Sequence, residues 1–193
     1  MLFVKNFASF VVNFPTEHTK KTQSTHKSKE LFFKELNTHK TYTVDEATKR
    51  MERYCAYQER CHKEVHQKLY EMRMIPEAVD QIIDHLLRHN FLNETRFAQA
   101  FARGKFRTKH WGRSRIVNEL KRREISKYNI QIALKEIPDS EYYKTFEALA
   151  EKRLRQLTSE KNLQKKRKKL ADYLFYRGWE PELVYSKINE ISK

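Results

Sequence analysis

Glycine and proline are scarce in this sequence, with three glycines and four prolines among 193 residues. An all-β chain of this length would need more turn residues than that. Long runs rich in Glu, Lys, Arg, Leu and Ala make up most of the remainder, and these residue types favour helices. The composition therefore predicts an all-α protein.

Cysteine is also rare. Cys55 and Cys61 are the only two, and they cannot form a disulfide framework, so we expect a cytoplasmic protein. The apolar start of the sequence is interrupted by Lys5 and is too short to cross a bilayer. No small-residue cleavage site follows it, so we expect neither an export signal nor a membrane partner.

Positive charge is the main excess. The formal net charge is +15 and the pI is about 9.7, which favours a polyanionic partner. The excess is uneven, because it is +4 in residues 1–42, −1 in 43–92, +8 in 93–138 and +4 in 139–193. A generally solvated basic surface remains the alternative interpretation.

An apolar pattern recurs along the chain. Leu69, Met74, Val79, Ile83 and Leu86 return 51 residues later as Leu120, Ile125, Ile130, Leu134 and Ile137, and 54 residues after that as Leu174, Trp179, Val184, Ile188 and Ile191. Self-similarity near this period is typical of tandem helical arrays. We therefore predict three three-helix repeats that form an elongated, curved, solenoid-like body of either hand.

The repeats predict four segments. Residues 1–42 are an N-terminal extension, expected to be largely disordered because residues 16–28 are polar. Repeat 1 is expected at 43–92, repeat 2 at 93–138 and repeat 3 at 139–193.

Local patterns indicate where several helices begin and end. Thr43 and Glu46 have the spacing of a capping box, and Pro76 suits the first position of a helix. Asn93 and Ser126 are expected to cap two further helices. Gly178 is expected to adopt a left-handed conformation at a helix end.

No pattern for catalysis is found, since the sequence lacks both a Gly-rich phosphate loop and a GxSxG motif. The pairs His62/His66 and His85/His89 have helical spacing, and Cys61 adjoins the first pair. Polar residues that flank apolar stripes give the same pattern, and the ligand set is incomplete. We therefore predict no catalytic residue, no metal and no cofactor.

Lys and Arg are concentrated in repeat 2 around an expected turn between two helices, and again in repeat 3. The candidate residues for binding nucleic acid are Arg103, Lys105, Arg107, Lys109, Arg113, Arg115, Arg122, Lys165, Lys166, Arg167, Lys168 and Lys169. Arg binds phosphate oxygens in a forked geometry, and a helix that starts at Gly112 would add backbone N–H groups. Trp111 is expected to pack on the helices beneath it, with base stacking as the alternative. Arg107 and Arg113 are both expected to be exposed.

The stretch around these residues resembles the central motif of the RecX family of bacterial recombination regulators. The matching residues are Leu92, Asn93, Glu94, Arg96, Phe97, Ala98, Gly112, Arg115, Ile116, Glu119, Leu120 and Ile125. Glu124 stands where the family usually has glycine. The resemblance covers about residues 43–193, and the central motif is its most specific part. Arg96 is expected to pair with Glu94 or Glu119.

The resemblance implies a non-enzymatic modulator of RecA in homologous recombination, DNA repair and the SOS response. Its implied partners are RecA, the RecA–DNA filament, and single- and double-stranded DNA without sequence preference, and we expect a monomer. Two alternatives remain. The middle repeat could read DNA as a free-standing helix-turn-helix-like protein, or the chain could be a helical-repeat adaptor for another acidic partner.

Overall fold

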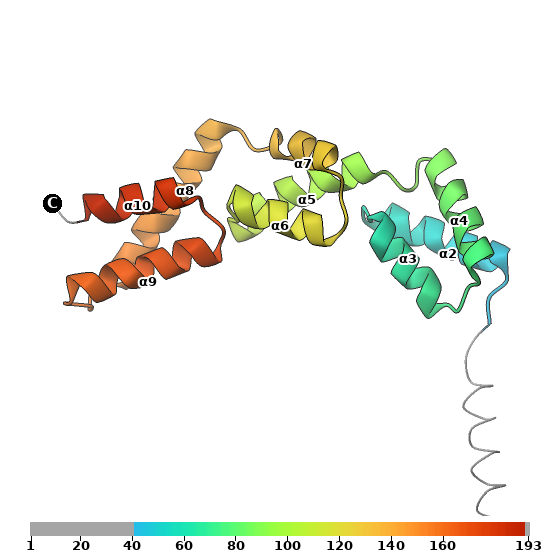
Figure 1. Cartoon of the computed structure of the whole chain (residues 1–193), viewed down its shortest axis with the longest axis horizontal. Helices are drawn as coiled ribbons and strands as arrows, with labels where there is room; N and C mark the ends of the chain where they lie inside the picture. The colour runs from blue at the N-terminus through green and yellow to red at the C-terminus, as the bar shows by residue number, and fades with distance from the viewer. Residues whose placement is uncertain (1–40, 192–193) are drawn as a thin grey trace, which may run out of the picture. The chain divides into compact units, whose positions relative to one another are not determined.

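The computed structural model describes residues 41–191, and this part contains nine α-helices and no strand (Figure 1). The helices are α2 (Val44–Tyr57), α3 (His62–Glu71), α4 (Pro76–Arg88), α5 (Glu94–Lys109), α6 (Arg113–Arg122), α7 (Lys127–Leu134), α8 (Asp139–Gln156), α9 (Leu163–Tyr176) and α10 (Pro181–Glu190). The all-α prediction is confirmed. The expectation for residues 1–40 lies outside the described residues.

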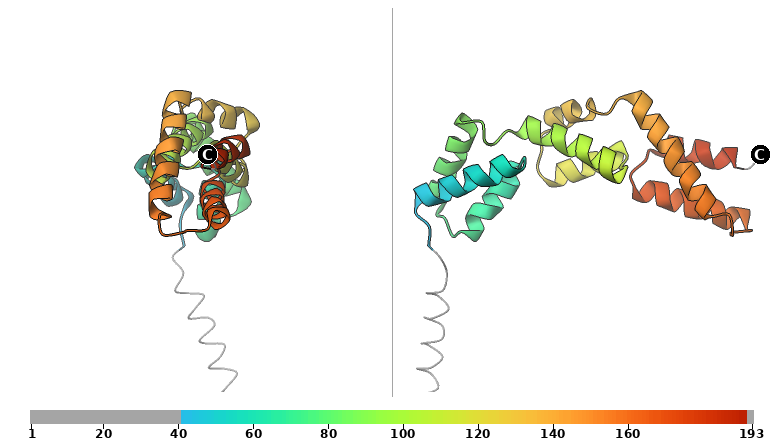
Figure 2. Two further views of the ribbon diagram at one scale, coloured as in Figure 1. Left: turned by 90° about the vertical axis from the view of Figure 1, so that its left-hand side faces the viewer. Right: turned by 180° about the vertical axis from the view of Figure 1, so that it is seen from behind.

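The helices pack in consecutive groups of three. In the first group α4 contacts α2 and α3, and in the second α5, α6 and α7 all contact one another. In the third group α9 contacts both α8 and α10. Figure 2 shows α5 against α6 and α7 from behind, and α9 beside α10. None of the helices in residues 41–191 is long and apolar enough to traverse a membrane.

The same turn joins the second helix of each group to the third. Its left-handed residues are Arg73, Glu124 and Gly178, with φ of 57°, 63° and 79°. After each, the next residue donates its N–H to the carbonyl of the leucine five positions earlier, Leu69, Leu120 or Leu174. This bond closes the helix end in a Schellman-type motif. The left-handed conformation predicted for Gly178 is confirmed, and Glu124 adopts it without glycine.

The equivalent leucines of the three turns are fully buried, each with 0% exposure. They lie in two apolar cores: one belongs to the first group of helices, and the other is continuous through the second and third groups. One detail of the predicted stripe is wrong. Ile83 is only half-buried, and Ile82 takes the fully buried place on α4.

The predicted helix starts are confirmed. The hydroxyl of Thr43 accepts the N–H of Glu46 within a capping box, and Asn93 and Ser126 cap α5 and α7 with their side-chain oxygens. The basic turn that we expected at residues 105–113 is shorter than predicted, because α5 continues through Lys109. The basic residues expected in a turn therefore lie mostly on the last turns of a helix.

Candidate nucleic-acid interface

The start of α6 is packed against the third group of helices. Gly112 donates its N–H to the carbonyl of Arg177 at 2.8 Å. A Cβ atom at Gly112 would lie 2.1 Å from the Gly178 carbonyl oxygen, so only glycine fits here. The next N–H, that of Arg113, donates to the hydroxyl of Tyr142. The first two N–H groups of this helix start therefore already have partners within the protein, and anion binding at the helix N-terminus stays a prediction.

Tyr142 connects the two groups of helices through its hydroxyl. The oxygen accepts the Arg113 N–H at 2.9 Å, and the hydroxyl donates to Oε2 of Glu180 at 2.6 Å. The side chain is 1% exposed. Burial, and then the bond to Glu180, raise the pKa of the Tyr142 phenol, so it remains a neutral donor.

Three of the candidate arginines are held by carboxylates, and one of them, Arg122, pairs with Glu119 at 3.0 Å. Nη2 of Arg113 donates to Asp139 at 2.5 Å and to the carbonyl of Ile137 at 3.1 Å, and the side chain is 27% exposed. The expectation that Arg113 is exposed is therefore wrong. Arg103 forms a similar pair with Glu136 at 2.7 Å. In each of these ion pairs the carboxylate offsets part of the positive charge that the arginine presents to a ligand.

Other basic residues gather on aromatic rings. Trp111 packs on the core, as expected, and Nζ of Lys105 and Cζ of Arg115 lie 5.5 and 4.2 Å from the centroid of its ring. Arg115 also lies 4.8 Å from the ring of Tyr176 and donates to the Tyr176 carbonyl at 2.6 Å. Lys105 also lies near a second ring, that of Phe101.

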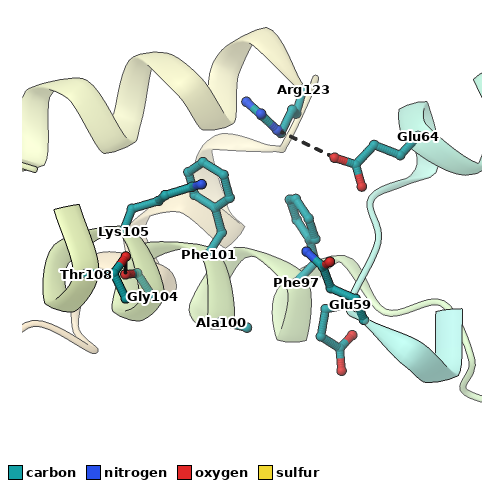
Figure 3. A pocket seen from close by; sticks show the side chains of 10 residues that line it. Glu59, Glu64, Phe97, Ala100, Phe101, Gly104, Lys105, Thr108 and Arg123 are labelled. Carbon is teal, nitrogen blue, oxygen red and sulfur yellow. Dashed lines mark hydrogen bonds and ion pairs between the residues drawn. The ribbon is translucent and has the colours of Figure 1, made fainter.

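Phe101 completes the series, because Lys105 and Arg123 lie 5.3 and 4.8 Å from its ring centroid. We call these residues the cation–aromatic ladder: Arg123, Phe101, Lys105, Trp111, Arg115 and Tyr176. Such contacts hold a cation in place. Lys105 and Arg115 have no carboxylate partner within residues 41–191, whereas Arg123 is paired with Glu119 at 2.9 Å. Figure 3 shows Arg123 and Lys105 beside Phe101.

A hollow of about 400 Å³ lies at each end of the ladder. The one in Figure 3 has Phe101, Lys105 and Arg123 on one side and the carboxylates of Glu59 and Glu64 on the other. The other hollow, of about 420 Å³, adjoins Arg115 and Tyr176 and includes the candidate Arg122. The second end is the more basic one, and Tyr176 is 75% exposed there.

The remaining candidates lie apart from the ladder. Arg107 and Lys109 are exposed on the last turn of α5. The run Lys165–Lys169 occupies the first half of α9, whereas the ladder meets α9 at its last residue. Within the run, Lys165 and Lys168 are exposed, Lys166 and Arg167 are half-buried, and Lys169 pairs with Glu160 at 2.6 Å.

The histidine pairs have other partners. His62 lies 3.2 Å from Glu94, and His85 lies 2.7 Å from Glu52. No group of three His, Cys, Asp or Glu side chains placed to hold a metal ion occurs within residues 41–191. Arg96 pairs with Glu59 at 2.5 Å, so the expected partners, Glu94 and Glu119, are wrong.

Three ladder residues, Phe101, Arg123 and Tyr176, were absent from the sequence-based candidates. Arg123 and Tyr176 sit just before the left-handed turns of the second and third groups, at Glu124 and Gly178. The repeat in the sequence indicated that Arg123 and Tyr176 lie near these turns. It did not indicate that Arg123 contacts the ring of Phe101 or that Arg115 contacts the ring of Tyr176.

Two family models match the chain. The models of the second and third three-helix domains of RecX match residues 93–134 and 139–188. The regulatory protein RecX of Yersinia enterocolitica is 29% identical over 115 residues, 60% of this chain and 66% of that protein. The regulatory protein RecX of Bacillus cytotoxicus is 26% identical over 140 residues, 72% of this chain and 52% of that protein.

A solved structure has the same fold. The crystal structure of RecX from Lactobacillus salivarius superposes with a TM-score of 0.66 at 23% identity, over 77% of this chain and 96% of that one. The chain spans between about half and two thirds of the length of the curated relatives named above.

Proposed function

Because this chain belongs to the RecX family, we propose that it is a non-enzymatic regulator of RecA that binds the RecA–DNA filament and restrains its activities. It acts in this proposal as a cytoplasmic monomer. The regulatory names of the relatives support the proposal, as does the excess of basic residues.

The single observation that carries the proposal is the cation–aromatic ladder. It spans α5, α6 and α9, which lie in the two segments that the RecX models match. Lys105 and Arg115 have no carboxylate partner within residues 41–191. Charges held in this way are suited to the phosphates of a DNA strand, whose recognition is independent of sequence.

One alternative is a helix-turn-helix-like reader of duplex DNA. In such a reader the first residues of the recognition helix contact base edges. The equivalent start of α6 is covered, since Gly112, Arg113 and Arg115 all bond to groups of α9, its C-terminal turn or α8. This geometry disfavours the reader and favours binding through phosphates.

The test compares binding to labelled oligo(dT) with binding to the same oligonucleotide coated with RecA, across a salt titration. We expect tighter binding to the coated strand and a fall in DNA-dependent ATP hydrolysis by RecA as the protein is added. Equal affinity for both substrates, with no effect on hydrolysis, would contradict the proposal. A strong preference for one duplex sequence would favour the reader instead.

A further inference from the structure

A third hollow, of about 380 Å³, lies away from the ladder between α8, α9 and the residue that follows α5. We call it the α8–α9 cleft. Its lining residues are His110, Lys144, Thr145, Ala148, Leu149, Lys152, Tyr173 and Arg177. None of them carries a carboxylate, so the cleft is basic and partly apolar.

The charges of this cleft are not neutralised within the protein. Lys144 and Lys152 are exposed and have no ion-pair partner in residues 41–191. By contrast, Arg113, Lys169 and Lys187 are each paired with a carboxylate. Unpaired cations around one cavity make it attractive to an anion.

Arg177 is already fixed at the edge of the cleft. Its Nη1 donates to the carbonyl of Lys109 at the end of α5, and its Cζ lies 4.8 Å from the ring centroid of Tyr173. Arg153 lies 5.0 Å from the same ring. A guanidinium held by two contacts loses little conformational entropy when it binds a ligand.

The two lysines approach the cleft from one face of α8. Lys144, Ala148 and Lys152 are successive residues at a spacing of four, so they lie on one side of the helix. Their Cα atoms are about 12 Å apart along the helix axis, and each side chain has a flexible four-carbon stem. The small Ala148 leaves room between them for a ligand group.

We propose that the α8–α9 cleft binds a phosphodiester group of a single-stranded DNA backbone. The volume exceeds that of one phosphate, and the apolar lining from Ala148, Leu149 and Tyr173 suits the attached sugar and base. The proposal rests on the proposed function in that the ligand is the DNA strand of a filament. It adds a contact on α8, outside the ladder.

The test uses the full chain with Lys144→Gln and Lys152→Gln together, which removes both charges and keeps good helix formers. A matched control is Lys121→Gln with Lys127→Gln, because these lysines are also exposed and do not line the cleft. Affinity for labelled oligo(dT) is measured by fluorescence anisotropy from low to high salt. Circular dichroism checks that all variants are folded.

We expect the cleft variant to bind more weakly and its log–log salt slope to fall by about 0.7, the value for one phosphate of a single strand. The control should keep the wild-type slope. Equal losses in both variants, or no loss in the cleft variant, would overturn the proposal. The proposed function is judged separately, because a slope change on bare oligo(dT) does not depend on RecA.

A second arm distinguishes the backbone of a strand from free phosphate. Inorganic phosphate is added to the wild-type complex at an ionic strength held constant with chloride. We expect little displacement of oligo(dT) at millimolar phosphate, because the apolar lining and neighbouring nucleotides contribute to strand binding. Full displacement in wild type but not in the cleft variant would show a free-phosphate site and would overturn the assignment to a strand.

Discussion

Gly112 and Gly178 fit against each other where α6 begins and α9 has ended. A Cβ atom at Gly112 would lie 2.1 Å from the carbonyl oxygen of Gly178. A Cβ atom at Gly178 would lie 2.3 Å from the Cβ atom of Arg115. Both are contacts that real Cβ atoms do not make. We call this contact between the start of α6 and the end of α9 the joint. It depends on two glycines that come from different groups of helices.

The first prediction is that Gly112→Ala destabilises the protein. The added methyl group meets backbone rather than a flexible side chain, so the joint must open. We expect a loss of about 1–3 kcal/mol, as for other overpacked sites. Urea denaturation followed by circular dichroism measures it.

Gly104→Ala is the matched control for this substitution. Gly104 lies within α5, and a Cβ atom there would meet nothing within 4 Å. We expect this variant to gain about 0.5–1 kcal/mol, because alanine favours the helix. A Gly112→Ala protein as stable as wild type would show that the joint can move without cost.

The second prediction concerns Glu124, which has a φ of 63° at the end of α6. A side chain in the left-handed region costs about 1–2 kcal/mol that glycine does not incur. Glu124→Gly also removes the exposed pair with Lys63, worth about 0–1 kcal/mol. We expect a net gain in the midpoint of urea denaturation.

Glu124→Ala separates these two terms, because it removes the ion pair and keeps the left-handed side chain. We expect this variant to be less stable than Glu124→Gly. If the alanine variant equals or exceeds the glycine variant, backbone strain at this turn is negligible.

The third prediction is that Leu120→Ala costs about 2–5 kcal/mol, the range for buried leucines. Leu120 is 0% exposed, and its carbonyl also closes the end of α6. Thermal unfolding compares this variant with Leu163→Ala, whose leucine is 43% exposed. Similar melting temperatures for the two variants would contradict the packing described for α6.

The features that depend on neighbouring residues were predictable from the sequence. The cap at Asn93 and the turn at Gly178 each depend on a few adjacent residues, and the repeat of buried leucines depends on spacing alone. These are short-range preferences of the backbone and of apolar side chains. They therefore predicted the helices and their order correctly.

Contacts between distant residues were not predictable in this way. Gly112 has the same local sequence whether its N–H is free or bonded to Arg177, and Arg113 has the same charge whether or not it reaches Asp139. Only the packing of one group of helices on the next decides between these states. The sequence therefore identified the basic residues but not which of them are already neutralised.

The fourth prediction uses this difference between the basic residues. Arg107 and Lys109 are exposed, and their side chains have no partner within residues 41–191. Arg113 is half-buried and bonds to Asp139 and to the carbonyl of Ile137. We expect Arg107→Gln with Lys109→Gln to weaken DNA binding and leave stability unchanged, and Arg113→Gln to lower stability.

For the exposed pair, each phosphate contact that is lost should reduce the salt slope by about 0.7 on single-stranded DNA. Oligonucleotides of different sequence should be affected equally, because phosphates carry no sequence information. For Arg113→Gln, the lost hydrogen bonds to a carboxylate and a carbonyl should cost about 1–3 kcal/mol. Salt titrations and urea denaturation of both variants measure the two effects. If the exposed pair leaves the slope unchanged, the end of α5 is an ordinary solvated surface and the binding charges lie elsewhere.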